Sequence, residues 1–239
     1  MPIQIGGMVP LTTIDYPDHL SCVLFCQGCA WRCHYCHNPE LIAPVGSTPV
    51  AWDEVLAFLH KRQGLLQAVV FSGGEATLQP GLPDAMQQIK ELGFKVGLHT
   101  AGIKPRMLEK VLPLCDWVGF DVKAARGQVD GVTQIIGSDA ANWHSLQLLL
   151  ASGVDYECRT TVHWNLLQPD DLRLLARQLQ EQGVQRFVVQ PARDGHTLMP
   201  DLGPQTQPAG LPELWNELAV LFEHFSLRHS FDCRPVLCH

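Results

Sequence analysis

The feature that most constrains the fold is a regular alternation of short apolar runs and amphipathic segments from residue 20 onward. Runs rich in β-branched and aromatic residues, such as VVF, precede stretches such as DDLRLLARQLQEQG, in which Leu recurs at helical spacing. This alternation is typical of βα units around a parallel sheet. The pattern predicts strands near 20–26, 66–71, 95–99, 116–120, 154–160 and 184–189, and helices near 52–63, 81–92, 104–112, 139–151, 169–182 and 211–224.

The length of the chain limits how many units can form a barrel. An eight-unit barrel takes about 250 residues, and here 239 residues include a lead of about 50 that completes no unit. We therefore predict an α/β fold with six units, a partial (β/α)6 TIM-like barrel. We expect a single domain over 1–239, with an extension at 1–19, the barrel at 20–225 and a tail at 226–239. Three stretches fit neither element and are expected to be long loops: 38–50, 124–138 and 193–210.

Composition excludes several classes of function. A hydrophobic content of 46% is ample for a core, and a net charge of -7 without a basic cluster argues against a nucleic-acid surface. The N-terminus lacks the layout of a signal peptide, and no apolar run reaches the roughly 18 residues of a membrane span. Nine cysteines, five of them between Cys22 and Cys36, suit a metal site in a reducing compartment. We expect a cytoplasmic protein that binds neither nucleic acid nor membrane.

The densest chemical signal is the loop after the first predicted strand, VLFCQGCAWRCHYCHN. Cys29, Cys33 and Cys36 have C-x3-C-x2-C spacing, and three such thiolates can hold three corners of a cubane iron–sulfur cluster, with one iron open to a substrate. Cys26 forms an additional C-x2-C pair with Cys29, so a four-cysteine zinc or electron-transfer site is an alternative. Free cysteine is among the most buried residue types, so we expect packed thiols at Cys22, Cys26, Cys115 and Cys158.

Polar residues follow the other predicted strands, at the end where the loops of a barrel converge. They are Ser72, Gly73, Gly74 and Glu75 after the second strand, His99 and Thr100 after the third, Asp121 and Lys123 after the fourth, and Gln190 and Arg193 after the sixth. Two adjacent glycines let the backbone approach a ligand with no Cβ in the way. We expect all these residues to lie on one rim.

The cysteine loop, with Tyr35 before its last cysteine, and the SGGE segment resemble the signature of the radical S-adenosylmethionine (radical SAM) superfamily. Within it, the chain is most similar to activating enzymes of glycyl radical enzymes, in particular those of anaerobic ribonucleoside-triphosphate reductase. The resemblance is carried by LTTIDYPDHLSCVLFCQGCAWRCHYCHNPEL at 11–41 and FSGGEATLQ at 71–79, and more faintly by DVK and VVQP.

The resemblance implies the cofactors and their contacts. It implies a 4Fe–4S cluster on the three loop cysteines, with an open iron that chelates S-adenosylmethionine, and contact between the GGE motif and the amino group of that ligand. Lys123, beside Asp121, would meet the methionine carboxylate, and Arg193 would face the ribose or sulfonium. Tyr35 and His37 complete the cofactor-binding candidates, His37 beside the cluster or the adenine. Solvent-exposed positions remain the alternative for Asp121, Lys123, His37 and Arg193.

The resemblance also implies the reaction. An electron from a donor such as flavodoxin or ferredoxin would cleave S-adenosylmethionine to methionine and a 5′-deoxyadenosyl radical. That radical would abstract hydrogen from a glycine Cα of a partner, expected to be anaerobic ribonucleoside-triphosphate reductase. This step needs no protein acid, base or nucleophile, so we name no catalytic side chain. The loops 124–138 and 193–210 are the expected partner contacts.

Alternatives remain at this point. A radical SAM enzyme acting on a small molecule would share the barrel, and a non-catalytic iron–sulfur or zinc binding module would share the cysteines. Cys233 and Cys238 could bind a metal together with His239, or could lie in a disordered terminus.

Overall fold

A computed structural model describes residues 3–46, 49–193, 197–199 and 202–228. Its centre is one eight-stranded sheet whose strands lie side by side in chain order. The first pair is antiparallel and every later pair is parallel. The strands are β1 (Ile5–Thr12), β2 (Ser21–Cys26), β3 (Ala68–Gly73), β4 (Lys95–Thr100), β5 (Trp117–Asp121), β6 (Asp155–Val162), β7 (Arg186–Pro191) and β8 (His224–Leu227).

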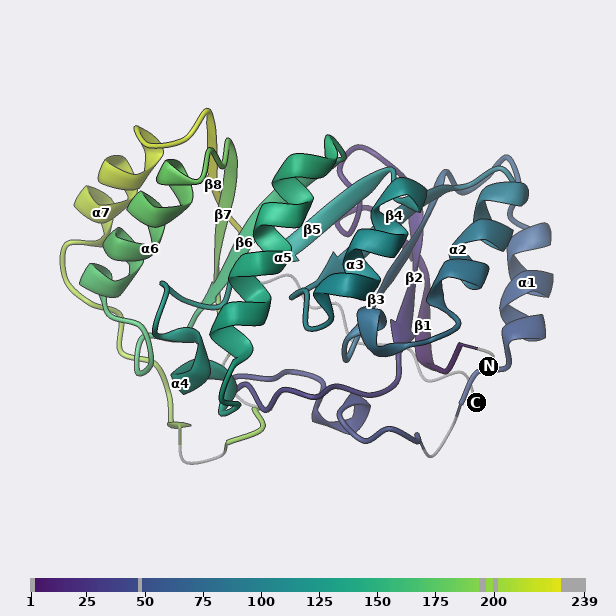
Figure 1. Cartoon of the computed structure of the whole chain (residues 1–239), viewed down its shortest axis with the longest axis horizontal. Helices are drawn as coiled ribbons and strands as arrows, with labels where there is room; N and C mark the ends of the chain where they lie inside the picture. The colour runs from purple at the N-terminus through teal and green to yellow at the C-terminus, as the bar shows by residue number, and fades with distance from the viewer. Residues whose placement is uncertain (1–2, 47–48, 194–196, 200–201, 229–239) are drawn as a thin grey trace.

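Helices connect the parallel strands, as the crossover between two parallel neighbours requires. The α-helices are α1 (Trp52–His60), α2 (Leu82–Glu91), α3 (Pro105–Val111), α4 (Val129–Thr133), α5 (Ser138–Ser152), α6 (Pro169–Glu181) and α7 (Leu211–Ala219). Short 3-10 helices are η1 (Pro39–Leu41), η2 (Ala76–Leu78) and η3 (Leu112–Leu114). Figure 1 shows α1, α2, α3, α5, α6 and α7 side by side along the sheet, with α4 at its lower edge. Within the described ranges, none of these helices has the length and apolarity to cross a membrane.

The six predicted βα units are present from β2 to β7, which confirms the partial barrel. Two strands were missed. The stretch expected to be an extension contains β1, whose sequence IGGMVPLT has two Gly and a Pro that obscure a strand pattern. The last predicted helix ends at Ala219, and the four-residue β8 follows, where a helix end and a tail were expected. Whether such a short or Gly-rich segment becomes a strand depends on its pairing with a neighbouring strand.

The loop predicted at 124–138 was also wrong in part, because it contains α4 and the first residue of α5. A five-residue helix is too short to display a helical repeat in the sequence. Of the loop predicted at 38–50, residues Pro39–Leu41 form η1. Parts of 193–210, and Cys233, Cys238 and His239, lie outside the described residues.

The helices form because their apolar residues repeat on one face and their ends are capped. In α6, Gln168 and Asp171 form a reciprocal capping box and Pro169 stands in the first turn. One face of this helix is buried in the main hydrophobic core and carries Leu172, Leu175, Ala176 and Leu179. The polar face is left to solvent, as the Leu spacing predicted.

The other face of the sheet has a separate, smaller core near the amino ends of the strands. Val23, Val70 and Trp117 from β2, β3 and β5 pack there with Tyr16, which comes from the loop between β1 and β2. The rings of Tyr16 and Trp117 lie 5.4 Å apart between centroids. This apolar cluster fills the amino-terminal end of the inner face, so a cavity is left at the carboxyl ends of the strands.

Candidate active site

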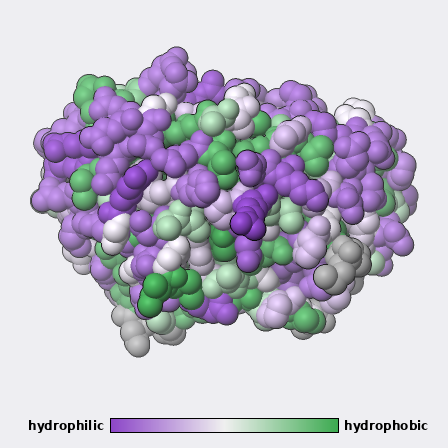
Figure 2. Space-filling model, viewed as in Figure 1, coloured by the Kyte–Doolittle hydropathy of each residue, from purple (hydrophilic) through white to green (hydrophobic). Residues whose placement is uncertain are grey.

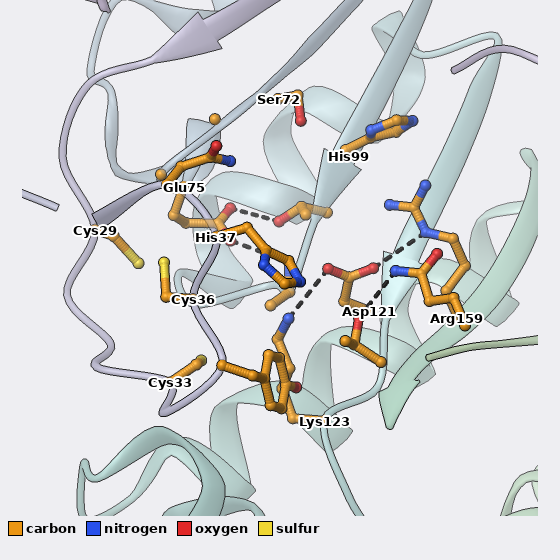
Figure 3. Close-up of a pocket in the computed structure, with 18 of the residues that line it drawn as sticks. Cys29, Cys33, Cys36, His37, Ser72, Glu75, His99, Asp121, Lys123 and Arg159 are labelled. Atoms are coloured by element: carbon orange, nitrogen blue, oxygen red, sulfur yellow. Dashed lines mark hydrogen bonds and ion pairs between the residues drawn. The ribbon is translucent and has the colours of Figure 1, made fainter. Parts of the chain in front are cut away.

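A cavity of about 330 Å³ opens at the carboxyl ends of the strands. In Figure 3 the sulfur atoms of Cys29, Cys33 and Cys36 approach it from one side, and Asp121 and Arg159 face it from the other. All of the candidates predicted from the sequence line this cavity: Cys29, Cys33, Tyr35, Cys36, His37, Ser72, Gly73, Gly74, Glu75, His99, Thr100, Asp121, Lys123, Gln190 and Arg193. The single predicted rim is therefore confirmed.

The loop that carries the cysteines is held by backbone hydrogen bonds to the segment that follows it. The N–H of Gly28 donates to the Leu41 carbonyl at 2.8 Å, and the N–H of Cys29 donates to the Ile42 carbonyl at 3.1 Å. Gly28 has a φ of 96°, in the left-handed region that favours glycine. The short loop is thus folded back on itself directly after β2.

The three loop thiols fit metal ligation. Burial raises the pKa of the Cys29 thiol to about 12, and burial also raises the pKa of Cys33 and Cys36, although nearby Lys123 lowers it in part. Thiolates in such a site need strong positive charge beside them, which iron supplies. The donor set, half-buried and grouped at one wall of the cavity, therefore suits an iron–sulfur cluster with three cysteine ligands.

Cys26 belongs to the core instead. It is fully buried with Cys22, Cys115 and Cys158 nearly or fully so, as predicted, and burial raises the pKa of Cys26 above its usual range. It does not line the cavity. In the described part of the chain, no three His, Cys, Asp or Glu side chains, the loop cysteines included, are grouped closely enough to hold one metal ion. A cubane cluster makes no such demand, because its cysteine ligands bind different iron atoms. The four-cysteine zinc site has no support in this geometry.

Asp121 joins two cations on the wall opposite the cysteines. Its Oδ2 accepts from Lys123 Nζ and its Oδ1 from Arg159 Nε, each at 3.1 Å. Burial would raise the pKa of Asp121, but Lys123 and Arg159 lower it to about 2. Burial opposes the charged form of Lys123, yet Asp121 holds the Lys123 pKa well above its usual range. A fixed ammonium group therefore faces the cavity, 5.9 Å from the centre of the Tyr35 ring.

Arg159 is the functional candidate that sequence reasoning missed. Its side chain is 7% exposed, and its Nη2 donates to the Gly119 carbonyl at 3.1 Å. A Cβ at Gly119 would lie 2.7 Å from the guanidinium carbon, so glycine leaves the room that Arg159 occupies. An arginine inside a predicted strand was the available signal, since buried arginine is rare unless paired.

Glu75 is buried and fully engaged by hydrogen bonds. Its Oε1 accepts from the Oγ1 of Thr77 at 2.6 Å and from Thr100 Oγ1, and its Oε2 accepts from the Ala101 N–H at 3.0 Å. Burial raises the pKa of Glu75, while these donors oppose that shift. The side chain ties the end of β3 to the end of β4 (Figure 3).

The structure gives the adjacent glycines Gly73 and Gly74 a different role from the close approach to a ligand that the sequence predicted. A Cβ on Gly73 would collide with backbone atoms of Cys26, and a Cβ on Gly74 would collide with the backbone of Gly28 and Leu41. Gly73 also has a φ of 107°. Space around these glycines is therefore taken by the cysteine loop itself. They allow β3 to pack directly against the segment that carries the thiols.

Three further candidates complete the cavity wall. The hydroxyl of Tyr35 is buried and has no hydrogen-bond partner in the described part of the chain. The Nε2 of His37 accepts from the Arg193 N–H at 3.2 Å, which ties the sixth-unit loop to the cysteine loop. His99 Nε2 lies 2.8 Å from the Asp15 carbonyl. Burial, reinforced by Arg159, lowers the pKa of His99 to about 4, so its imidazole is neutral at pH 7.

Comparison with known proteins identifies the family. Residues 23–163 match the radical SAM superfamily. The chain belongs to the radical SAM superfamily. Its members are enzymes that use a 4Fe–4S cluster and S-adenosylmethionine, so the cofactors expected from the sequence are those of the family.

Individual proteins of known sequence or structure are also similar to this chain. The chain is 31% identical over 212 residues to a Methanocaldococcus jannaschii protein provisionally named a glycyl-radical enzyme activating enzyme, covering 81% of this chain and 84% of that protein. It is 37% identical over 125 residues to the pyruvate formate-lyase-activating enzyme of Clostridium pasteurianum, half of this chain and 52% of that one. The crystal structure of QueE from Escherichia coli has the same fold, with a TM-score of 0.60, 15% identity, and coverage of 96% of this chain and 94% of that one.

Proposed function

We propose that this protein is an activating enzyme that generates a glycyl radical on anaerobic ribonucleoside-triphosphate reductase. The observation that supports this most directly is the convergence of three loop cysteines and a fixed Lys123–Asp121 pair on one cavity. The similarity to a glycyl-radical enzyme activating enzyme over 81% of the chain supports the class of partner. The choice of reductase rests on the sequence resemblance at 11–41 and 71–79.

In this proposal the loop cysteines and the opposite wall divide the work of binding. Cys29, Cys33 and Cys36 hold the cluster, and Lys123 binds the methionine carboxylate of S-adenosylmethionine. Asp121 keeps Lys123 charged and in place, as their 3.1 Å ion pair and the raised pKa of Lys123 support. A charge-assisted contact between an ammonium and a carboxylate is stronger than a neutral hydrogen bond and favours one orientation of the ligand.

The remaining candidates shape the cavity. We assign the segment Ser72–Glu75 to the amino group of the ligand. Its main chain lines the cavity, while the Glu75 carboxylate is already engaged by Thr77, Thr100 and Ala101. Tyr35, with its unpartnered buried hydroxyl, and His37 are assigned to the adenine side, and Arg193 to the ribose or sulfonium side.

When bound, the cluster and S-adenosylmethionine supply reductive cleavage of the sulfonium and a carbon radical that removes hydrogen from a glycine Cα. The protein orients the ligand, excludes water and needs no acid or base of its own. We further propose that the electron comes from flavodoxin or ferredoxin, that the chain acts as one domain, and that it works in the cytoplasm, where thiols stay reduced.

The test is anaerobic reconstitution with iron and sulfide, followed by reduction with dithionite and measurement of 5′-deoxyadenosine. The assay is run alone, with anaerobic ribonucleoside-triphosphate reductase, and with pyruvate formate-lyase. We expect a glycyl radical signal with the reductase. A signal only with pyruvate formate-lyase would move the proposal to another partner, and multiple turnovers on a small molecule without any protein partner would overturn it.

A matched variant separates ligand binding from folding. Lys123→Met removes the ammonium but keeps the length of the side chain, and it should weaken S-adenosylmethionine binding at least tenfold, about the value of one charge-assisted hydrogen bond. Exposed Lys110→Met on the last turn of α3 is the control. Equal affinity in the two variants would contradict the role given to Lys123.

A further inference from the structure

The surface beside the cysteine loop has an outer face that carries exposed apolar side chains from other segments of the chain. Ile136 is 97% exposed and Met199 is 39% exposed, and neither lines the cavity. Apolar side chains gather at the lower left of Figure 2, over α4 and the start of α5 as placed in Figure 1. Large exposed apolar side chains that group together commonly mark an interaction site.

Two segments far apart in sequence meet the cysteine loop at this face. The N–H of His34 donates to the Val132 carbonyl at 3.3 Å, and the His34 carbonyl accepts from the Met199 N–H at 3.2 Å. The N–H of Arg32 donates to the Thr133 carbonyl at 2.9 Å. The segments that carry the two exposed apolar side chains are thus both hydrogen-bonded to the loop that carries the cysteines.

The turn that presents Ile136 is well ordered by hydrogen bonds. One carboxylate, that of Asp130, accepts from the N–H groups of Gly137 and Asp139, each at 2.8 Å. Gln134 adopts a φ of 59°, which is uncommon for a residue other than glycine. A backbone that is already held in place loses little conformational freedom on binding, so this turn is suited to contact a partner.

Positive charge accompanies the apolar side chains. The Arg32 side chain is exposed, and its Nη1 donates to the carbonyls of Cys29 and Trp31 at 2.9 Å each. Among the residues that the structure describes, no carboxylate forms an ion pair with Arg32. On a chain of net charge -7, this cation therefore offers its charge to an acidic partner.

We propose that the outer face formed by Arg32, Ile136 and Met199 is the docking site of a low-potential one-electron carrier protein with an acidic rim around its redox centre. The inference rests on the proposed function. The cavity side of the loop is needed for S-adenosylmethionine and the partner glycine, whereas the outer face brings a carrier against the backbone of the cluster ligands. Weak redox encounters use interfaces below about 1,200 Å², and opposite charge speeds them.

The test compares Ile136→Asp and Arg32→Glu with Val220→Asp, which alters an equally aliphatic side chain, 81% exposed, at the end of α7. The probes are a bacterial flavodoxin and a bacterial ferredoxin, with the reconstituted enzyme. We measure carrier affinity by calorimetry at two salt concentrations and the rate of carrier oxidation by stopped flow. Ile136→Asp and Arg32→Glu should weaken affinity for the preferred carrier at least tenfold, since each adds repulsion to a lost contact, and Val220→Asp should not. Arg32→Glu, which reverses a charge, should change the salt dependence more than Ile136→Asp, which adds one.

Reduction by dithionite separates the two proposals. Cleavage of S-adenosylmethionine driven by dithionite should be unchanged in Ile136→Asp, because the small reductant needs no docking site. Unchanged carrier affinity in Ile136→Asp and Arg32→Glu would overturn the docking site, as would a wild-type enzyme that binds neither carrier. Loss of the dithionite-driven glycyl radical in Ile136→Asp would assign the face to the radical enzyme instead. Failure of the wild type to cleave S-adenosylmethionine with dithionite would count against the proposed function alone.

Discussion

The two ends of the inner face of the barrel contrast sharply in chemistry. At the amino ends of the strands, Tyr16, Val70 and Trp117 fill the space with apolar contacts. At the carboxyl ends, β5 carries the half-buried Asp121 and its neighbour β6 carries the buried Arg159 beside a cavity. The difference shows that one sheet separates stability from chemistry along its strands. The apolar end stabilises the fold, and it meets the cavity wall through an edge contact between Trp117 and His99, whose ring centroids lie 5.6 Å apart.

The largest expected effect comes from the cysteine loop at the carboxyl end. Cys33→Ser removes one thiol from the cavity wall, and after reconstitution it should show little cluster and no formation of 5′-deoxyadenosine. Cys26→Ala changes a buried thiol only a few residues away and should keep both. Iron content, the cluster's absorbance and the nucleoside assay measure these outcomes. Loss of the cluster in Cys26→Ala would support the alternative in which Cys26 is a fourth cysteine ligand.

The amino end should respond in the opposite way. Trp117→Ala leaves a cavity among Tyr16, Val23 and Val70, and it should lower the free energy of unfolding by about 3–5 kcal/mol. Trp117→Phe, the conservative control, should cost much less. Urea unfolding of the apoprotein followed by circular dichroism measures both. If Trp117→Ala still folds, its affinity for S-adenosylmethionine should be near that of the wild type, because Trp117 does not line the cavity. A large loss of affinity in the folded variant would erase the contrast between the two ends.

The smallest expected effect is a fall in the free energy of unfolding at low pH, caused by charged groups at the carboxyl end. Lys123 and Arg159 lower the pKa of Asp121 to about 2, despite burial, whereas an unfolded chain has about 3.9. The unfolded state therefore takes up a proton first, so this contribution is present above pH 4 and is lost as the pH falls towards 2. Its size is roughly 2 kcal/mol. His99 acts in the same direction between about pH 6.5 and 4, because its pKa is lowered to about 4.

Asp121→Asn isolates the contribution of Asp121. It should destabilise the apoprotein at pH 7, and the difference from the wild type should shrink steadily between pH 4 and pH 2, as the carboxylate becomes protonated in the wild type. Unfolding free energies at several pH values measure this convergence. A difference that stays constant down to pH 2.5 would mean that Asp121 stabilises the fold through packing rather than through charge.

Much of the architecture could be predicted from the sequence because it depends on local pattern. Apolar runs and Leu spacing predicted β2 to β7 and most of the helices, and strands in successive βα units are parallel neighbours. Placing residues after consecutive parallel strands also predicted that Glu75, Asp121 and Arg193 would meet at one cavity. Local pattern failed for β1, β8 and α4, which are short or interrupted by Gly and Pro and depend on their neighbours for stability.

The sequence by itself determined the order of the βα units, the cysteine spacing and the edge of the sheet at which the polar residues gather. Only the tertiary structure decided which of those residues touch. Three sets of contacts join different strands and loops. They are the ion pairs of Asp121 with Lys123 and Arg159, the space that Gly119 leaves for the guanidinium, and the packing of Gly73 and Gly74 against the cysteine loop. Contacts of this kind depend on the distance between neighbouring strands and on the space that other side chains leave, and neither is encoded in any local run of residues.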